Sequence, residues 1–456
     1  MVSQHDRPAP SSGPGDPEDP GTPPGSRTPA GPGTPAEPGA PAEPGPAAAS
    51  GPAAEPGASA AVASGGAARA GRGRRVARRA LIAVPTALVV LAGVAYAGTE
   101  IMDVPPPHTL YRVQTTVPSR WGDLFPARPV AAPARAVPLT ADPRPVPAAV
   151  PWKGGRIPFA RFLGDTHTNA FLILRDGRIG YEWYAEGITA GTRLSSWSMA
   201  KSLVSLLVGQ AIGRGELSED DRLTDLLPEF RTGGEYDRIT VRDLLDMASG
   251  VDVWENYNPY WPFTGTARMY LTRDLPGFVK DNRKVAYTPG SRATYRSVDT
   301  QILGLILTKV TGRPLADLLA ERIWGPVGAE RPATWNLDDT GGTEKAYCCV
   351  NATARDYARI GRLVLDNGRV GDRQVIPPAW ITRIATPAPH KLGTSGYSAQ
   401  WWHPAGGTGD YSALGIHGQY IYVNPATRTV IVKLSDHGTE QDEQETFEVL
   451  RALSRT

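Results

Sequence analysis

Ser198 and Lys201 stand three residues apart, in a segment that reads Ser-Met-Ala-Lys. A free serine hydroxyl is a weak nucleophile and needs a base within reach. Residues i and i+3 of a helix share a face, so the amine of Lys201 can take the proton of Ser198 if burial keeps part of it neutral. The first turn of a helix also offers free N–H groups to an oxyanion. The spacing therefore predicts Ser198 as a nucleophile and Lys201 as its base.

The same residues also fit a structural role, in which the serine caps a helix and the lysine extends to solvent. Two observations favour chemistry. Lys201 is the only one of the eight lysines with a serine three residues before it, and the helix expected over 200–212 is apolar on nearly every face. A helix that is apolar all round is buried. A Ser-His-Asp hydrolase finds no support, because the chain has no Gly-x-Ser-x-Gly segment.

Two later segments could join this chemistry. Tyr295 and Ser297 precede an apolar helix expected over 298–311. A tyrosine beside a lysine can relay a proton to a leaving group, and Ser297 could hold it in line, although a surface tyrosine before a helix is common. Residues 415–423 are typical of an edge strand whose glycines let a ligand approach the backbone. His417 in that strand could contact substrate or serve the structure.

No metal or cofactor site is expected. The seven histidines show no His-x-His or His-x-x-x-His pair, and Cys348 and Cys349 are adjacent, without the spacing of a zinc site. Neighbouring cysteines rarely reach disulfide geometry, because their Cα atoms are too close and their side chains diverge. We therefore expect no disulfide. The net charge of +2 gives no reason to expect a nucleic-acid partner.

The elements that must position these residues indicate an α+β fold. A β-hairpin is expected over 171–184, with Asp176-Gly177 as its turn, and strands are expected near the other end, over 397–402, 418–423 and 429–434. Helices are expected between them, and one more near 440–453. This order predicts an antiparallel sheet built from N- and C-terminal segments, flanked by helices, with a mostly helical inserted subdomain.

The chain changes composition four times. Residues 1–68 are rich in Pro, Gly and Ala without apolar periodicity, which predicts a disordered tail. An arginine cluster occupies 69–79, and 80–98 is an uncharged apolar run just long enough to span a bilayer. Residues 99–150 carry many prolines and fit a stalk or a wrapping segment. Residues 151–456 have the composition and length of a large folded domain.

The apolar run 80–98 has two interpretations. One is an uncleaved, single-pass signal-anchor helix in the cytoplasmic membrane; the other is a signal peptide cut after Ala97, which would give a secreted protein. The long run and the long chain before it favour the anchor. A buried core helix would not usually lie between an arginine block and a disordered tail. Because arginines precede the run and acidic residues follow it, we expect the folded domain outside the cytoplasm.

Taken together, these segments resemble the serine β-lactamase/penicillin-binding superfamily. Within it, the chain resembles the class C-like branch that contains esterases, D-aminopeptidases and 6-aminohexanoate-dimer hydrolases. The order of the motifs matches: Ser-x-x-Lys, then Tyr-x-Ser in place of the usual Tyr-x-Asn, then a glycine-bearing strand. The resemblance covers about 155–453. Flanking stretches that match are 244–250, 287–290, 310–314, 352–358 and 418–425.

The resemblance implies an acyl-enzyme mechanism. Ser198 would attack a carbonyl carbon, and Lys201 would accept its proton. Tyr295 would pass a proton to the leaving group and then help to activate water for deacylation. The backbone N–H groups of Ser198 and Ile416 would hold the oxyanion.

The chain departs from the family at the third motif, where Ala413-Leu-Gly415 replaces the usual Lys-Thr-Gly or His-Thr-Gly. The cation that grips a substrate carboxylate is therefore missing, and whether His417 replaces it stays open. This favours small amides and esters over penicillins or peptidoglycan stems. Residues 254–257 resemble a loop of the aminohexanoate-dimer hydrolases in which a tyrosine closes over the substrate, so Tyr257 becomes a substrate-binding candidate.

We therefore expect a serine hydrolase of small-molecule amides or esters, without a cofactor. Two alternatives remain: a β-lactamase or D,D-peptidase that acts on cell-wall-type substrates, and a non-catalytic protein that binds cell-wall peptide. The presence of Ser198, Lys201 and Tyr295 together argues against a non-catalytic binder. No oligomeric state is predicted.

Overall fold

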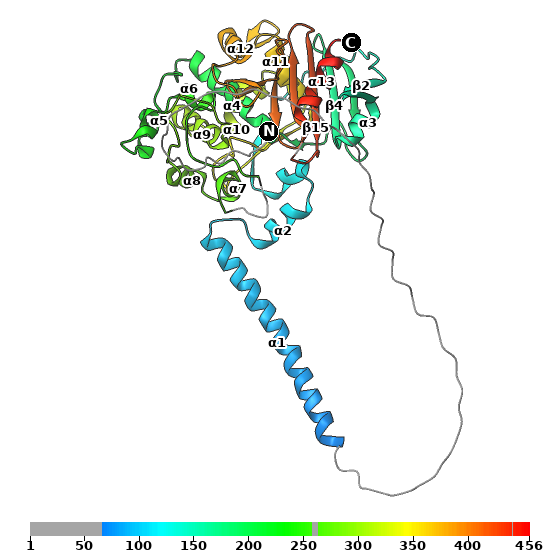
Figure 1. Ribbon diagram of the computed structural model, residues 1–456, viewed down its shortest axis with the longest axis vertical. Coiled ribbons are helices and arrows are strands. Elements are labelled where there is room, and N and C mark those ends of the chain that lie inside the picture. The colour runs from blue at the N-terminus through cyan, green and yellow to red at the C-terminus, as the bar shows by residue number, and fades with distance from the viewer. Residues whose placement is uncertain (1–65, 258–262, 440) are drawn as a thin grey trace, which may run out of the picture. The chain divides into compact units, whose positions relative to one another are not determined.

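The computed structural model describes residues 66–257, 263–439 and 441–456 (Figure 1). Most of the tail expected over 1–68 lies outside the described residues, as do the side chains of the arginine cluster at 69–79. Residues Val90–Thr456 form one compact unit, which holds the folded domain.

A seven-stranded antiparallel sheet runs through the domain. Its order brings the first strands of the domain, β4 and β5, beside the last one, β15, as the sequence predicts. The fold class expected from the sequence is therefore confirmed. In spatial order the strands are β11 (Gly396–Ser398), β12 (Trp401–His403), β13 (Tyr411–Gly415), β14 (Gln419–Asn424), β15 (Thr429–Ser435), β4 (Thr168–Arg175) and β5 (Arg178–Tyr184).

One tight turn in this sheet was not expected. The sequence predicts a single strand over 397–402, whereas the structure has the hairpin of β11 and β12 there, turning at Ala399 and Gln400. Both residues have positive φ, 45° and 68°, without a glycine to signal it. The expected hairpin at Asp176-Gly177 is present, with φ of 49° and 75°, which suits a two-residue turn.

Smaller strands and helices complete the domain. A four-stranded sheet consists of β1 (Ala127–Val130), β7 (Ala333–Asn336), β8 (Val350–Ala352) and β6 (Leu194–Ser195). Two hairpins are β2 (Ala149–Trp152) with β3 (Gly155–Pro158), and β9 (Arg369–Val370) with β10 (Arg373–Gln374). The α-helices are α1 (Gly66–Ile101), α2 (Pro107–Thr115), α3 (Phe159–Asp165), α4 (Met199–Gly213), α5 (Leu223–Leu226), α6 (Val241–Leu245), α7 (Gly265–Leu271), α8 (Leu275–Asp281), α9 (Ser297–Thr311), α10 (Leu315–Leu319), α11 (Ala354–Leu365), α12 (Pro378–Ala385) and α13 (Glu443–Ser454). Short helical turns are η1 (Pro118–Leu124), η2 (Pro228–Phe230), η3 (Glu235–Arg238) and η4 (Ala320–Trp324).

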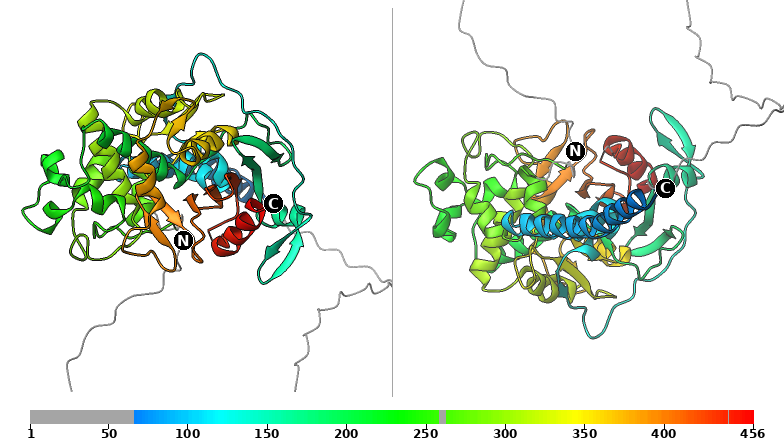
Figure 2. Two further views of the ribbon diagram at one scale, coloured as in Figure 1. Left: turned by 90° about the horizontal axis from the view of Figure 1, so that it is seen from above. Right: turned by 90° about the horizontal axis from the view of Figure 1, so that it is seen from below.

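The seven-stranded sheet is covered on both faces (Figure 2). Along β4, Leu172 and Leu174 belong to the core shared with α4 and α11, while Phe171 and Ile173 face the core shared with α13. This alternation follows from the two-residue period of a strand. Because both faces are apolar, the strand reads as a continuous hydrophobic run.

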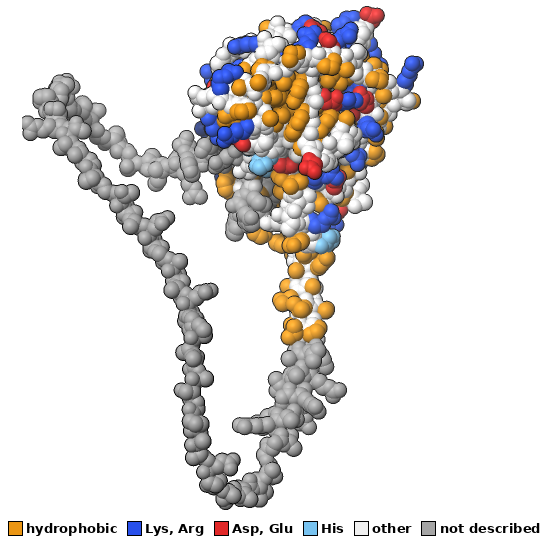
Figure 3. Space-filling model, turned by 90° about the vertical axis from the view of Figure 1, so that its right-hand side faces the viewer, with side chains coloured by type: hydrophobic (Ala, Val, Ile, Leu, Met, Phe, Trp, Pro, Cys, Tyr) orange, Lys and Arg blue, Asp and Glu red, His pale blue; other side chains and the backbone are white. Residues whose placement is uncertain are grey.

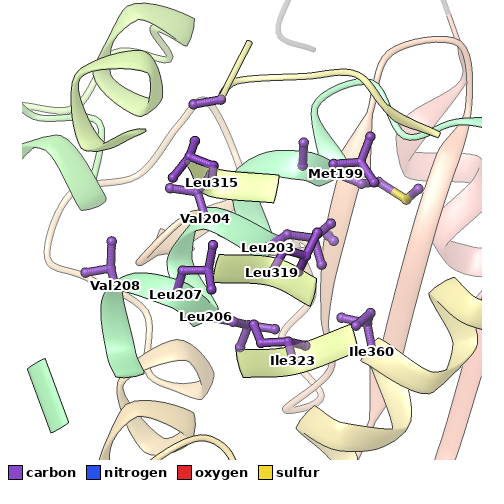
Figure 4. Close-up of a cluster of buried hydrophobic side chains, with 14 of the residues drawn as sticks. Met199, Leu203, Val204, Leu206, Leu207, Val208, Leu315, Leu319, Ile323 and Ile360 are labelled. Atoms are coloured by element: carbon purple, nitrogen blue, oxygen red, sulfur yellow. The ribbon is translucent and has the colours of Figure 1, made fainter. Parts of the chain in front are cut away.

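Helix α4 lies in the middle of the larger core. Figure 4 shows its side chains Leu203 and Leu207 packed among Leu319 of α10, Ile323 of η4 and Ile360 of α11. Residues Met199–Ala211 of the helix are all buried, as the apolar pattern predicts. The helix that follows Ser198 is therefore fixed on every side.

The segment 99–150 is packed on the domain. Val104 and Val113 share a cluster with Phe125 and Leu271, and β1 pairs with β7. The domain boundary expected at 151 falls inside β2, and the packed elements begin further toward the N-terminus, at α2. Parts of the segment 99–150 therefore contact the domain through this apolar cluster and through the pairing of β1 with β7.

Helix α1 contains the apolar run. Within the described part of the chain, Val84–Ile101 is the one stretch of helix long and apolar enough to cross a membrane by length and composition. Its large apolar side chains from Val84 to Val94 are exposed, as the orange side chains in Figure 3 show. Ala97, the expected cleavage position, lies inside this helix.

Cys348 and Cys349 form a disulfide with each other, so the expectation that they would not was wrong. We call this bond the vicinal disulfide. Its Cα atoms are 3.7 Å apart, closer than in ordinary disulfides. Cys349 adopts a φ of 73°, in the left-handed region that non-glycine residues rarely enter. The usual rule assumes that neighbouring side chains diverge, and this backbone turn brings the two sulfurs together.

Candidate active site

Ser198 stands at the N-cap of α4, and Lys201 lies one turn along the same helix. Lys201 Nζ is 2.9 Å from Ser198 Oγ, within hydrogen-bond distance. Trp197, just before the serine, has a φ of 47°. This sharp, unusual backbone conformation at the entry to α4 is of the kind that concentrates at functional sites.

Lys201 is buried, with 1% of its surface exposed. Its Nζ also donates to Ser297 Oγ at 3.0 Å and to the backbone carbonyl of Tyr347 at 2.9 Å. Burial lowers the pKa of Lys201 to about 7, although the carboxylates of Glu255 and Asp299 act in the opposite direction. Roughly half of this amine is then neutral near pH 7, so it can accept a proton from Ser198.

Tyr295 lies beside the same amine, with its ring centroid 5.0 Å from Lys201 Nζ. It stands directly before the N-cap residue of α9, so the start of that helix fixes its backbone. Burial raises the pKa of Tyr295 well above its ordinary value, Glu255 raises it further, and a hydrogen bond with Ser198 lowers it. The phenol therefore stays protonated at neutral pH and can pass a proton on.

Glu255 is a site residue that the sequence analysis did not single out. Its carboxylate accepts hydrogen bonds from Ser297, through N at 2.8 Å and Oγ at 2.5 Å. It also accepts from the hydroxyl of Tyr257 and from Thr266 Oγ1 at 2.9 Å. Because Ser297 Oγ contacts both Lys201 and Glu255, the serine connects the amine to a buried carboxylate. The sequence feature that could have indicated this role is the position of Glu255 within the segment 254–257, two residues before Tyr257.

Gly415 at the end of β13 lets the strand approach the nucleophile. A Cβ at this position would stand 2.5 Å from the carbonyl oxygen of Ser196 and 3.1 Å from the backbone nitrogen of Ser198, so a larger residue would push the strand away. Ile416 follows and lines the same pocket as Ser198. The backbone of Ser198 and that of Ile416 therefore lie beside the same pocket.

His417 lies in the same pocket but is held by the structure. Its Nδ1 is 2.9 Å from the carbonyl oxygen of Gly438, and its ring packs edge-on against Trp197 at 4.9 Å between centroids. Burial lowers the pKa of His417 to about 4. The imidazole is therefore neutral at neutral pH and does not supply the positive charge that the third motif lacks.

The pocket beside Ser198 has a volume of about 260 Å³. Ser297, Tyr257, Ile416 and His417 line it with Ser198, so the structure brings these predicted residues together. Among the described residues, no group of three or more His, Cys, Asp or Glu side chains could hold a metal ion.

Comparisons with known proteins identify a family and similar proteins. The family model described as Beta-lactamase matches residues 160–454. The 6-aminohexanoate-dimer hydrolase of Paenarthrobacter ureafaciens is 32% identical over 292 residues, which are 60% of this chain and 74% of that protein. A D-aminopeptidase of Brucella anthropi is 29% identical over 149 residues, 32% of this chain and 26% of that one.

Solved structures share the fold. A Bacillus anthracis protein with the provisional name 6-aminohexanoate-dimer hydrolase has a TM-score of 0.68 at 23% identity, over 76% of this chain and 94% of that one. The hydrolase EstCE1 has a TM-score of 0.52 at 16% identity, over 65% of this chain and 96% of that one. The family model spans the domain from α3 to α13, including the segments that carry Ser198 and Lys201. The chain therefore belongs to the beta-lactamase family and is a hydrolase of that superfamily.

Proposed function

We propose that this protein is a serine hydrolase that cleaves small amides or esters through an acyl-enzyme. The observation that carries the proposal is the buried amine of Lys201, 2.9 Å from Ser198 Oγ and with a pKa lowered to about 7. A lysine in this state is a competent base at neutral pH, and an exposed lysine is not.

In the first step, Ser198 Oγ attacks the carbonyl carbon of the substrate and its proton passes to Lys201. The ammonium that forms has acceptors in place, namely Ser297 Oγ at 3.0 Å and the carbonyl of Tyr347 at 2.9 Å. The negative carboxylate of Glu255, which accepts a hydrogen bond from Ser297, stabilises the positive charge of this ammonium. The oxyanion of the tetrahedral intermediate accepts hydrogen bonds from the backbone N–H groups of Ser198 and Ile416.

The tetrahedral intermediate then collapses, and the carbon–nitrogen or carbon–oxygen bond to the leaving group breaks. Tyr295 gives its proton to the leaving group and takes one from the ammonium of Lys201. In deacylation the same groups act in reverse: Tyr295 and Lys201 remove a proton from water, which attacks the acyl carbon and releases Ser198.

The substrate is an amide or ester in preference to a β-lactam or a D-Ala-D-Ala peptide. The similarity to a 6-aminohexanoate-dimer hydrolase over 292 residues supports an acyl compound of this kind. Ala413 stands where the third motif usually has a cation, and the pKa of the neighbouring His417 is lowered to about 4, so neither grips a substrate carboxylate.

The domain is held at the outer face of the cytoplasmic membrane by an uncleaved helix. The support is the length and apolar composition of Val84–Ile101 and the arginines that precede it in the sequence. Protease treatment of intact cells tests this orientation: we expect digestion of the domain from outside and a full-length chain in the membrane fraction before treatment. A soluble chain that begins near residue 98 would instead indicate cleavage.

Labelling with a fluorophosphonate, followed by peptide mapping, tests the nucleophile. We expect the adduct on Ser198 and its loss in the variant Ser198→Ala. Ser202→Ala is the matched control, because Ser202 is equally buried in α4 but donates to the carbonyl of Gln400. A folded protein without an adduct on Ser198 contradicts the proposal. Faster turnover of nitrocefin or a D-Ala-D-Ala peptide than of simple esters and amides would favour the cell-wall alternative.

A further inference from the structure

The described residues that line the pocket beside Ser198 carry no full charge at neutral pH. Among the described residues that line it, there is no Asp, Glu, Lys or Arg, and its one histidine, His417, is neutral at neutral pH. A substrate with a charged end would therefore lose its hydration without gaining a partner. This lining fits a neutral substrate.

The wall of the pocket is aromatic and begins at the nucleophile. Trp197 precedes Ser198 in the chain, stacks on Tyr270 of α7 at 5.8 Å and packs on Trp121 of η1 at 5.2 Å between ring centroids. All three line the pocket. The acyl group stays bonded to Ser198 in an acyl-enzyme while the leaving group departs. The wall that starts at Trp197 therefore lies beside the carbonyl carbon that Ser198 would attack.

The far end of the wall belongs to α2. Leu110 and Val113 of this helix line the pocket, and Val113 shares an apolar cluster with Leu271 of α7. Only residues 102–106 separate α2 from the end of α1. Five residues reach at most ~18 Å when fully extended, so the pocket is close along the chain to the end of the apolar helix.

The end of α1 is also tied to the other side of the pocket. Asp103 Oδ2 accepts from Thr272 Oγ1 at 3.0 Å and from the backbone N of Arg273 at 3.2 Å. Arg273 forms an ion pair with Glu100 at 2.9 Å. Thr272 and Arg273 directly follow α7, which supplies Tyr270 to the wall. The end of the apolar helix is therefore joined to α2 by residues 102–106 and to the end of α7 by these contacts.

We propose that the pocket takes the apolar acyl chain of a neutral ester or amide that resides in the membrane. This rests on the proposed function, that is, on Ser198 as nucleophile and α1 as anchor. The bond from Ser198 Oγ to the acyl carbon forms as the bond to the alcohol or amine breaks. The leaving group takes one proton, and water then releases the chain as a carboxylic acid.

A chain-length series tests the acyl pocket. The full-length protein in lipid nanodiscs is assayed with p-nitrophenyl butanoate, hexanoate and octanoate, and with a p-nitrophenyl ester that ends in a carboxylate. We expect kcat/KM to rise by about fourfold for each added methylene until the pocket is full, and to be lowest for the charged ester. A flat series, or a preference for the charged ester, overturns the proposal.

A pair of variants distinguishes two causes of a chain-length preference: binding of the acyl chain in the pocket and partition of the longer ester into lipid. Leu110→Lys puts a charge in the wall, and we expect it to lower the ratio of octanoate to butanoate turnover at least tenfold. Leu226→Lys is the matched control, because Leu226 is a partly buried leucine of α5 outside the pocket. An unchanged ratio in Leu110→Lys overturns the proposal.

Vesicle experiments test the membrane as the source. With a dodecanoyl ester, we expect faster turnover when the protein and the ester share phosphatidylcholine vesicles than when they are in separate vesicles. Equal rates overturn the membrane source. Fluorophosphonate labelling runs in parallel: labelled Ser198 with a flat chain-length series contradicts this inference alone, and a folded protein without a label contradicts the proposed function as well.

Discussion

Replacing Lys201 by arginine tests whether a neutral amine activates Ser198. Burial lowers the pKa of Lys201 to about 7, so roughly half of the amine is neutral at pH 7. An unperturbed lysine would be neutral in only about 0.03% of molecules at this pH. Arginine keeps the positive charge and similar length, but its pKa above about 12 leaves essentially no neutral form. The substitution thus removes the base while it keeps a buried cation.

The expected loss follows from these fractions. The neutral fraction falls by about five orders of magnitude, and the rate loss is limited by what general-base catalysis contributes, about 10² to 10⁴-fold. In the unaltered protein, the acylation rate should rise tenfold per pH unit below pH 6 and level off above pH 8, with its midpoint near 7. The rate rises with pH because the protonated form of Lys201, which dominates below pH 7, cannot accept the proton of Ser198.

The assay is the rate at which a fluorophosphonate phosphonylates Ser198 Oγ with loss of fluoride, measured from pH 5 to 9. Lys433→Arg is the matched control: burial lowers the pKa of Lys433 to about 7 as well, but its Nζ donates to the hydroxyl of Ser435. We expect Lys433→Arg to leave the midpoint unchanged, with circular dichroism verifying both folds. If Lys201→Arg, correctly folded, reacts at the original rate with a midpoint near 7, the assignment of the base is wrong.

Three further outcomes follow from the site. Glu255→Gln should move the midpoint of the pH profile to lower pH, because the carboxylate raises the pKa of Lys201, and should slow acylation; an unmoved midpoint would exclude the coupling. Tyr295→Phe should slow amide hydrolysis by about 10² to 10⁴-fold and p-nitrophenyl ester hydrolysis less, since that leaving group needs no proton; equal losses in steady-state assays would argue against a relay. Reduction of the vicinal disulfide, verified by mass spectrometry, should slow acylation by freeing the carbonyl of Tyr347 that holds the amine; unchanged rates would show that the bond does not position it. Between pH 7 and 10, unfolded chains bind more protons than the folded one at Lys433, so stability in urea should rise with pH, by at most about 1.4 kcal/mol per unit for this lysine. Lys433→Met should reduce that rise by the share of this lysine, while Lys201 and Lys345, whose pKa values are also lowered to about 7, keep theirs.

The parts that sequence reasoning predicted are those fixed by neighbours in the chain. Ser198 and Lys201 lie within one turn of one helix, and their contact follows from helical geometry. The apolar pattern after Met199 predicts burial of α4, and the alternation and turn signals predict the strands that pair at the two ends of the domain. In each case the period of the backbone carries the information.

The parts that it missed depend on distant segments or on unusual backbone. Glu255 reaches Ser297 across 42 residues, and nothing in the local sequence predicts that this carboxylate lies in the hydrogen-bond network of Lys201. The vicinal disulfide requires a positive φ at Cys349, a conformation that a cysteine rarely adopts. The prolines of 99–150 signal an extended chain, but whether it wraps the domain depends on the apolar surface that Val113 meets on Leu271.

The apolar pocket and the buried ion network act together. The wall of the pocket beside Ser198 is largely apolar, and charge interactions are stronger where water is excluded. Transfer of the proton from Ser198 creates an ammonium at Lys201, whose acceptors are already in place and are connected through Ser297 to Glu255. A charged substrate end would draw water into the same space and weaken that attraction. In the mechanism proposed here, the uncharged described lining that would favour a neutral acyl group would also strengthen the electrostatic stabilisation of the transition state.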